Sequence, residues 1–117
     1  MKKEAINQVL VEFYNRVYQD LMIGYLFTPF DREQLIEKQL EFTLSIFGKG
    51  TYRGKGLRQA HAPLNLRPGH LRRRQVILTQ VLVDLGVPEE FRNHWLQSEA
   101  KVLNQILSST PSCVSPL

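Results

Sequence analysis

Apolar residues recur at intervals of three and four along four stretches of this chain, and glycine or proline follows each stretch. The stretches cover residues 4–21, 31–47, 68–85 and 88–107. This interval places apolar side chains on one face of an α-helix, and glycine and proline are residues at which helices end. We find no strand pattern and no internal repeat. The periodicity therefore predicts an all-α fold.

Turn and cap residues bound the first two stretches. Residues 22–30, with Gly24 and Pro29 among bulky apolar side chains, are expected to form a tight buried corner. Asp31 followed by Gln34 predicts the start of the next helix, because a short acidic side chain caps free backbone N–H groups. Gly48 is expected to end it. The inward faces hold Ile6, Val9, Leu10, Phe13, Tyr14, Val17 and Leu21, then Leu35, Ile36, Gln39, Leu40, Phe42, Ile46 and Phe47.

Proline opens both later helices. Pro68 begins one, and Pro88 with Glu89 begins the other, where an acid suits the positive end of the helix dipole. Gly86 separates the two. The expected inward residues are Leu71, Leu78, Val81, Leu82 and Leu85, then Phe91, Trp95, Val102, Leu103 and Ile106. Because serine and proline dominate after Leu107, we expect one domain over residues 1–108 and a disordered tail over 109–117.

Composition narrows the class of protein. The chain has 117 residues, enough for one domain with a real core. No segment approaches the ~18 consecutive apolar residues of a membrane helix, and polar residues interrupt any signal-peptide core near the start. We therefore expect a cytoplasmic protein without a membrane partner. The single cysteine, Cys113, excludes an internal disulfide and a cysteine-rich metal site.

The net charge of +4 comes with one dense basic run, Arg72-Arg73-Arg74. No aromatic residues interleave with this run, so a nucleic-acid partner is not expected. We interpret the run as the solvated start of a helix. His70 and His94 have no second ligand at helical spacing, and a zinc site is not expected.

Three side chains are candidates for chemistry. His61 lies in a short basic and apolar run, Leu57–Leu64, that Pro63 interrupts. Tyr14 and Gln39 lie on apolar helix faces, where a buried hydroxyl or amide needs a hydrogen-bond partner. Considered alone, each residue is also compatible with ordinary packing and a bond to a neighbouring backbone group.

The order and spacing of these residues resemble those of the truncated haemoglobins, small globins with a two-over-two helical sandwich. The resemblance spans residues 4–107 and rests on Phe13-Tyr14, Phe27, Lys38-Gln39, Phe42, Tyr52-Arg53-Gly54 and His61. It implies haem b, with His61 as the iron ligand and Tyr14 and Gln39 as hydrogen-bonding partners of a gas ligand on the opposite side. It also implies haem contacts from Phe27, Leu35, Lys38, Phe42 and Leu57, with Lys38 reaching a propionate.

Three departures from the family pattern matter. The chain begins inside what should be the second globin helix, so most of the first helix is expected to be lacking. Leu71 stands where the family usually has an aromatic residue. Arg74 falls on an apolar stripe near the haem, where a guanidinium needs a partner. We expect Arg74 to extend to solvent, to pair with a propionate or another acid, or to mark a different kind of pocket.

The resemblance implies reversible binding of oxygen or another diatomic gas, nitric oxide or carbon monoxide. A second hypothesis is a nitric oxide dioxygenase. That enzyme would need an external reductase as its partner, since the sequence has no flavin or nicotinamide motif. A third hypothesis is a haem-free globin-like domain that senses or binds a partner, which Arg74 and the lacking first helix motivate.

Overall fold

We describe the chain from a computed structural model that covers residues 1–48 and 67–109, with side chains described up to residue 104. Within these residues the regular structure is entirely helical, as the periodicity predicts. The helices are α1 (Lys3–Gln19), α2 (Gly24–Phe27), α3 (Arg32–Ile46), α5 (Pro68–Asp84) and α6 (Glu89–Ser109). Ser109 still belongs to α6, and residues 110–117 of the predicted tail lie outside the described part.

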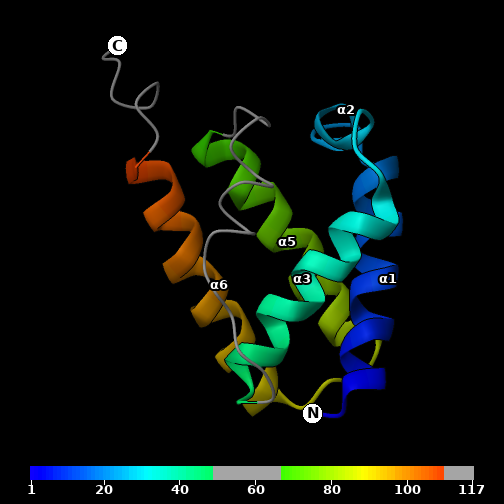
Figure 1. The fold of residues 1–117 in the computed structure, drawn as a ribbon, viewed down its shortest axis with the longest axis vertical. Coiled ribbons are helices and arrows are strands. Elements are labelled where there is room, and N and C mark those ends of the chain that lie inside the picture. The colour runs from blue at the N-terminus through cyan, green and yellow to red at the C-terminus, as the bar shows by residue number, and fades with distance from the viewer. Residues whose placement is uncertain (49–66, 110–117) are drawn as a thin grey trace.

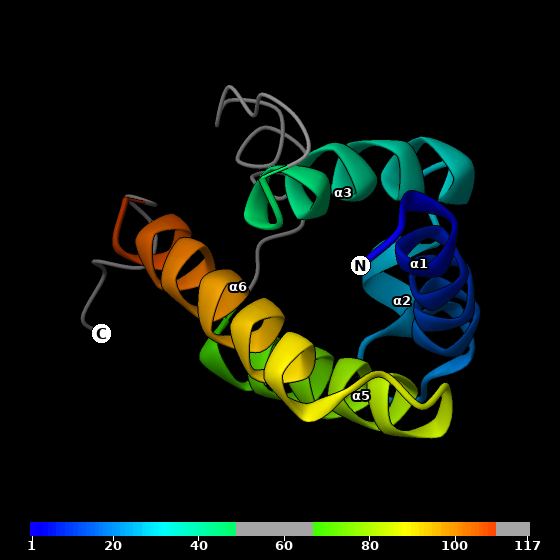
Figure 2. The same cartoon turned by 90° about the horizontal axis from the view of Figure 1, so that it is seen from below.

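The long helices of the described part surround one interior. α1 packs against both α3 and α5, and α6 packs against both α5 and α3 (Figure 1). α5 and α6 run antiparallel and are joined by a short turn at residues 85–88. Seen from below, α3 and α1 lie on one side of the interior, and α5 and α6 lie on the other (Figure 2). Side chains from all four helices therefore meet in the centre.

Most positions of the predicted apolar faces are confirmed. The buried members are Ile6, Val9, Leu10, Phe13, Tyr14 and Val17 in α1, Leu35, Ile36 and Phe42 in α3, Leu71, Leu78, Val81 and Leu82 in α5, and Trp95 and Leu103 in α6. Two positions are wrong, because Leu21 is 99% exposed and Leu85 is 47% exposed. Both lie just beyond the end of their helix, where the helical period no longer decides which way a side chain points. The side chain of Ile106 lies outside the described part.

The corner between α1 and α2 is built on Asp20. Its carboxylate accepts hydrogen bonds from the backbone N–H groups of Met22 at 3.0 Å and Ile23 at 3.1 Å, and from Arg73 at 2.7 Å. The Arg73 guanidinium lowers the pKa of Asp20, although partial burial acts in the opposite direction. Ile23 turns inward, while Met22 and Tyr25 remain 60% and 62% exposed. The prediction that this corner is buried is therefore wrong for Met22 and Tyr25. Hydrogen bonds to Asp20 hold the turn, so it does not need these side chains in the interior.

Other helix ends follow their predicted cap residues. Asp31 Oδ2 accepts a hydrogen bond from the backbone N–H of Gln34 at 3.1 Å and so starts α3. Gly48 and Gly86 have φ angles of 72° and 73°, the left-handed conformation that favours glycine, just after α3 and α5. Pro68 occupies the first turn of α5. These ends set which residues of α3 and α5 can face the interior.

The C-terminal end of α3 is attached to α6. His94 Nε2 lies 2.8 Å from the carbonyl oxygen of Ile46. The Phe47 ring packs edge-on against the Trp95 ring, with centroids 6.0 Å apart. These contacts fix the position of α6 along α3, so that the next turn of α6 faces the middle of α3.

Gly24→Ala should destabilise the fold. A Cβ atom at this position would lie 2.9 Å from the Tyr18 carbonyl oxygen and 3.1 Å from that of Val17, and neither backbone atom can rotate away. Overpacking of this kind costs roughly 1–3 kcal/mol. Denaturant unfolding followed by circular dichroism measures the loss.

Gly69→Ala is the matched control. The atom nearest to its added Cβ is Arg72 Nη2 at 3.8 Å, an ordinary contact, and alanine favours helix over glycine. We expect this variant to be at least as stable as the wild type. Equal losses at both glycines would contradict the close approach of α1 and α2.

Candidate functional site

The structure buries two of the predicted site residues, and others lie outside the described part of the chain. Tyr14 of α1 and Gln39 of α3 are 2% and 1% exposed. His61, Leu57 and the segment Tyr52-Arg53-Gly54 lie outside the described residues, so their roles remain predictions. The other predicted haem contacts are Phe27, Leu35 and Phe42, which are buried, and Lys38, which is exposed.

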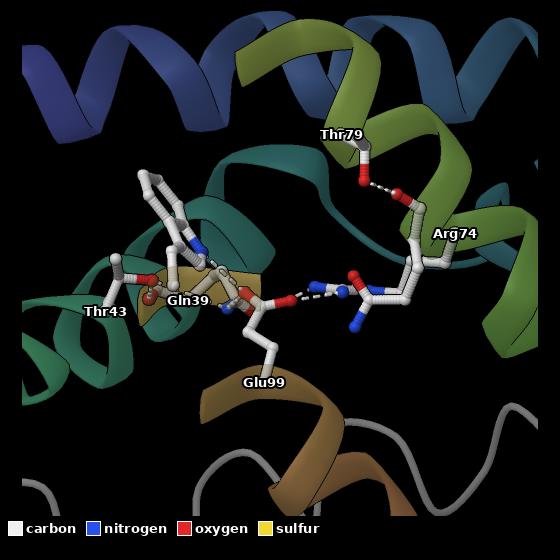
Figure 3. A network of polar contacts seen from close by, with 7 residues as sticks. Gln39, Thr43, Arg74, Thr79 and Glu99 are labelled. Carbon is white, nitrogen blue, oxygen red and sulfur yellow. Dashed lines mark hydrogen bonds and ion pairs between the residues drawn. The ribbon is translucent and has the colours of Figure 1, made fainter. Parts of the chain in front are cut away.

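The centre of the interior is the carboxylate of Glu99, which α6 contributes and which is 2% exposed. Glu99 Oε1 lies 2.5 Å from Arg74 Nη1 of α5, and Oε2 accepts hydrogen bonds from Gln39 Nε2 at 2.6 Å and Trp95 Nε1 at 2.9 Å. Figure 3 shows the side chains of Arg74 and Glu99 extending toward one another from their two helices. Both oxygens of this buried carboxylate are therefore paired.

Arg74 is the second charged group of the interior and is also 2% exposed. Its Nη2 lies 3.4 Å from Gln39 Oε1, and its Cζ lies 4.8 Å from the centroid of the Phe13 ring. Burial acts to lower the pKa of Arg74. The negative charge of Glu99 and the neighbouring Tyr14 act in the opposite direction, and together they raise the pKa above its ordinary value. The guanidinium therefore keeps its charge, paired with an acid inside the protein.

Gln39 is held at both ends of its amide. The Nε2 atom donates to Glu99 and faces Thr43 Oγ1 at 3.5 Å, while the Oε1 atom faces Arg74. Thr43 Oγ1 in turn donates to the Gln39 carbonyl oxygen at 2.8 Å, one turn back in α3. The carboxylate of Glu99 can only accept hydrogen bonds, and the guanidinium of Arg74 can only donate them. These two partners therefore determine which end of the amide is its nitrogen and which is its oxygen.

Tyr14 completes the cluster from α1. Burial raises its pKa to about 12, although the hydrogen bond and charge of Arg74 act in the opposite direction. The hydroxyl therefore stays protonated at neutral pH. Its ring packs edge-on against Phe27, with centroids 6.4 Å apart, on the side toward α2. Tyr14 thus packs its ring against the apolar residue Phe27, while the charge of Arg74 acts on its hydroxyl.

These contacts link four helices through side chains that are almost fully buried. Two opposite charges cancel, and each is also hydrogen-bonded, which is the condition under which a buried ion pair is tolerated. Removing one partner of such a pair typically costs about 3–5 kcal/mol because the other charge is left uncompensated. Arg74 and Glu99 are therefore mutually dependent in this fold.

Glu99 is not among the predicted site residues, and part of the basic run is buried where a solvated helix start was predicted. Of Arg72-Arg73-Arg74, Arg72 is exposed and Arg73 binds Asp20, but Arg74 is buried, so a solvated helix start is wrong for Arg74. Of the alternatives expected for Arg74, pairing with an acid of the protein is the one that the structure shows. Glu99 follows Trp95 by one helical turn and so falls on the predicted apolar face of α6. An acid there, opposite an arginine on an apolar stripe, was the pattern that could have revealed the pair.

Comparison with known families agrees with the helical arrangement. A model of the family described as bacterial-like globin matches residues 2–108. The chain is a bacterial-like globin. Among curated proteins, no match to this globin is found. In the described ranges, 1–48 and 67–109, no helix is both long and apolar enough to cross a membrane.

Globins generally hold haem, and the interior of this globin supplies donors suited to one side of such a site. Tyr14, Gln39 and Arg74 each carry an N–H or O–H donor, and they converge from three helices. A guanidinium is a donor only and carries several N–H groups, so the cluster is rich in donors. Phe27 of α2 and Phe42 of α3 supply buried aromatic surface. These side chains are donors of the kind that a haem-bound gas needs, but Gln39 and Arg74 already pair with Glu99 and with each other, and the expected iron ligand lies outside the described residues.

Arg74→Met should strongly destabilise this globin. The substitution leaves Glu99 in the interior without its counter-charge, at a cost of about 3–5 kcal/mol. The double variant Arg74→Met/Glu99→Gln removes both charges and keeps an acceptor for Trp95, so it should recover most of the loss. Thermal unfolding of the variants measures the coupling.

Arg73→Met is the control for loss of a charge from the same helix. The Arg73 side chain is 36% exposed, and its partner Asp20, although only 7% exposed, keeps the backbone N–H groups of Met22 and Ile23 as donors, so we expect a smaller loss. A double variant no more stable than Arg74→Met alone would show that the ion pair is not what the interior depends on.

Proposed function

We propose that this globin binds haem b through His61 and holds a diatomic gas on the opposite side, beside Tyr14 and Gln39. The supporting observation is that these two side chains, from separate helices, are both buried in the centre, where Arg74 lies 3.4 Å from Gln39 and its charge acts on the pKa of Tyr14. Family membership supports the cofactor. The resemblance in order and spacing supports the truncated, two-over-two subtype and the use of His61.

Each neighbouring residue has a role in this proposal. Phe27, Leu35 and Phe42 would provide the apolar surface that holds the macrocycle, together with Leu57. Lys38 is exposed, as a partner for a propionate at the edge of the haem should be. When bound, haem supplies the iron on which a gas binds reversibly. Tyr14 and Gln39 would donate hydrogen bonds to the gas, Gln39 in place of its bond to Glu99, and their burial limits the access of water.

We further propose a single haem domain over residues 1–108 in a cytoplasmic protein. Reversible binding of oxygen, nitric oxide or carbon monoxide accounts for the site residues without another protein. Nitric oxide dioxygenase activity would need an external reductase. One observation favours the haem-free alternative: both Gln39 and Tyr14 already have protein partners in the cluster. A haem titration distinguishes that alternative from the main proposal.

His61→Ala should abolish the absorption spectrum of a histidine-ligated haem. Purified wild-type protein titrated with haem is expected to give distinct oxidised and reduced spectra with one haem per chain. His70→Ala and His94→Ala are matched controls, because His70 contacts the backbone N–H of Arg67 and His94 contacts Ile46. Both should retain the wild-type spectrum. An unchanged iron–histidine band in His61→Ala would remove His61 from the site.

Tyr14→Phe should speed the release of oxygen. Hydrogen bonds to charged or strongly polarised partners contribute about 1.5–3 kcal/mol, so the loss of one should raise the dissociation rate roughly 10- to 100-fold. Stopped-flow absorbance measures the rate. Tyr18→Phe is the matched control, because its hydroxyl donates to the Phe30 carbonyl oxygen at 2.8 Å, outside the cluster. Identical rates in both variants would argue against a ligand-binding role for Tyr14.

A further inference from the structure

The turn between α1 and α2 leaves three large apolar side chains exposed. Leu21 is 99% exposed, Met22 60% and Tyr25 62%, and they are three of the seven large apolar residues that are exposed in the described part of the chain. Exposed apolar residues that occur singly need no explanation, whereas a group of them marks an interaction surface. Because these three lie close together in one turn, we treat them as one surface and call them the corner patch.

Hydrogen bonds hold the corner patch in place. Asp20 accepts from the backbone N–H groups of Met22 at 3.0 Å and Ile23 at 3.1 Å, and it pairs with Arg73 at 2.7 Å. Ile23 is 1% exposed and anchors the turn in the core. The apolar side chains therefore extend from a fixed turn, which loses little further backbone freedom when a partner covers it.

The corner patch lies beside a basic stretch of α5. The ion pair of Asp20 with Arg73 fixes this neighbourhood, and Figure 1 shows α2 and the start of α5 at the same end of the molecule. Residues 67–83 contain four arginines and no acid. Of these arginines, Arg67 and Arg72 are exposed, and neither forms an ion pair within the described residues. The corner patch therefore has unpaired positive charge near it.

Few acids oppose this charge. Residues 21–30 contain no charged residue, and Asp20 is neutralised by Arg73. The next acids along the chain, Asp31 and Glu33, stand at the start of α3 with an arginine between them, and α3 lies across the interior from α5 (Figure 2). The surface between the corner patch and α5 is thus positive, and a complementary partner carries negative charge.

Two classes of partner combine an apolar layer with negative charge, an acidic protein and a membrane that contains anionic phospholipids. A stable protein interface buries roughly 800 Å² and about 20–30 residues on each side, and three side chains supply only a small part of it. A membrane needs less, because a few apolar side chains enter its interfacial layer while arginines attract the headgroups. A tyrosine also suits the boundary between lipid and water. The small size of the corner patch therefore favours a membrane.

We propose that the corner patch, with Arg67 and Arg72, docks this globin on the surface of a membrane that contains anionic phospholipids. Leu21 and Met22 enter the boundary between headgroups and acyl chains, and Tyr25 lies at the level of the headgroups. The arginines bind phosphate groups. The expectation of no membrane partner came from the lack of spanning segments, and surface attachment is a different mode. The proposal does not depend on haem.

Flotation of the purified protein with lipid vesicles tests the proposal. The protein should float with vesicles of phosphatidylglycerol and phosphatidylcholine in equal parts, and far less with phosphatidylcholine alone. Leu21→Ser/Met22→Ser should weaken binding on the order of 10-fold or more. Val83→Ser/Leu85→Ser is the matched control, because these side chains are 49% and 47% exposed near the other end of α5. It should leave binding unchanged.

The arginines have a matched control of their own. Arg67→Gln/Arg72→Gln should weaken binding roughly fivefold for each arginine, and added salt should weaken the wild type in the same way. Lys2→Gln/Lys3→Gln removes the same charge from exposed positions at the opposite end of α1 and should have little effect (Figure 1). Circular dichroism establishes that each variant is folded.

Three results would overturn the proposal. Wild-type protein that does not float with the anionic vesicles would leave the corner patch to a protein. A dimer in analytical ultracentrifugation that Leu21→Ser/Met22→Ser disrupts would then identify a second copy as that protein. Unchanged vesicle binding in the same variant would remove the corner patch from the docking surface, and equal losses in the arginine and lysine variants would reduce the attraction to net charge. Flotation follows the protein itself, so its failure is distinct from the absence of a haem spectrum.

Discussion

The carboxylate of Glu99 can lie in the interior of this globin only because a guanidinium lies beside it. Both side chains are only 2% exposed to solvent, so each charge relies on the other and on neutral polar groups for its solvation. Arg74, Gln39 and Trp95 supply those donors from α5, α3 and α6. The packing of these helices therefore serves two requirements at once, burial of apolar surface and pairing of one carboxylate.

The periodicity of the sequence predicted the elements better than their ends. Asp31, Gly48 and Pro68 act locally, through hydrogen bonds or backbone angles that involve only near neighbours, so their effect could be predicted. Leu21 and Leu85 also fitted the repeat, but the helices stop before them. Where a helix stops depends partly on tertiary contacts such as that of Arg73 with Asp20, which no local pattern contains.

The candidate site was predictable only in part, for a related reason. Tyr14 and Gln39 are neutral polar residues on apolar faces, a pattern that indicates an interior partner without identifying it. Their partners come from α5 and α6, far along the chain, and depend on how the helices cross. Arg74 likewise needed an acid, and several acids were available. The arrangement of the helices selected Glu99, which a one-dimensional pattern could not do.

Arg73 and Arg74 are adjacent in sequence but bind acids in different environments. Arg73 reaches Asp20 at the surface end of α1, and Arg74 reaches Glu99 in the centre. Successive residues of a helix point about 100° apart, so adjacent positions of α5 can serve acids that lie in two directions. A rotation of α5 by one residue in one sense would bring Gln75 to Glu99 in place of Arg74 and leave that carboxylate without a counter-charge. A rotation in the opposite sense would bring Arg73 to Glu99 and Arg72 to Asp20, so the charges exclude only one direction of slippage, and the buried apolar residues of the same helix must exclude the other.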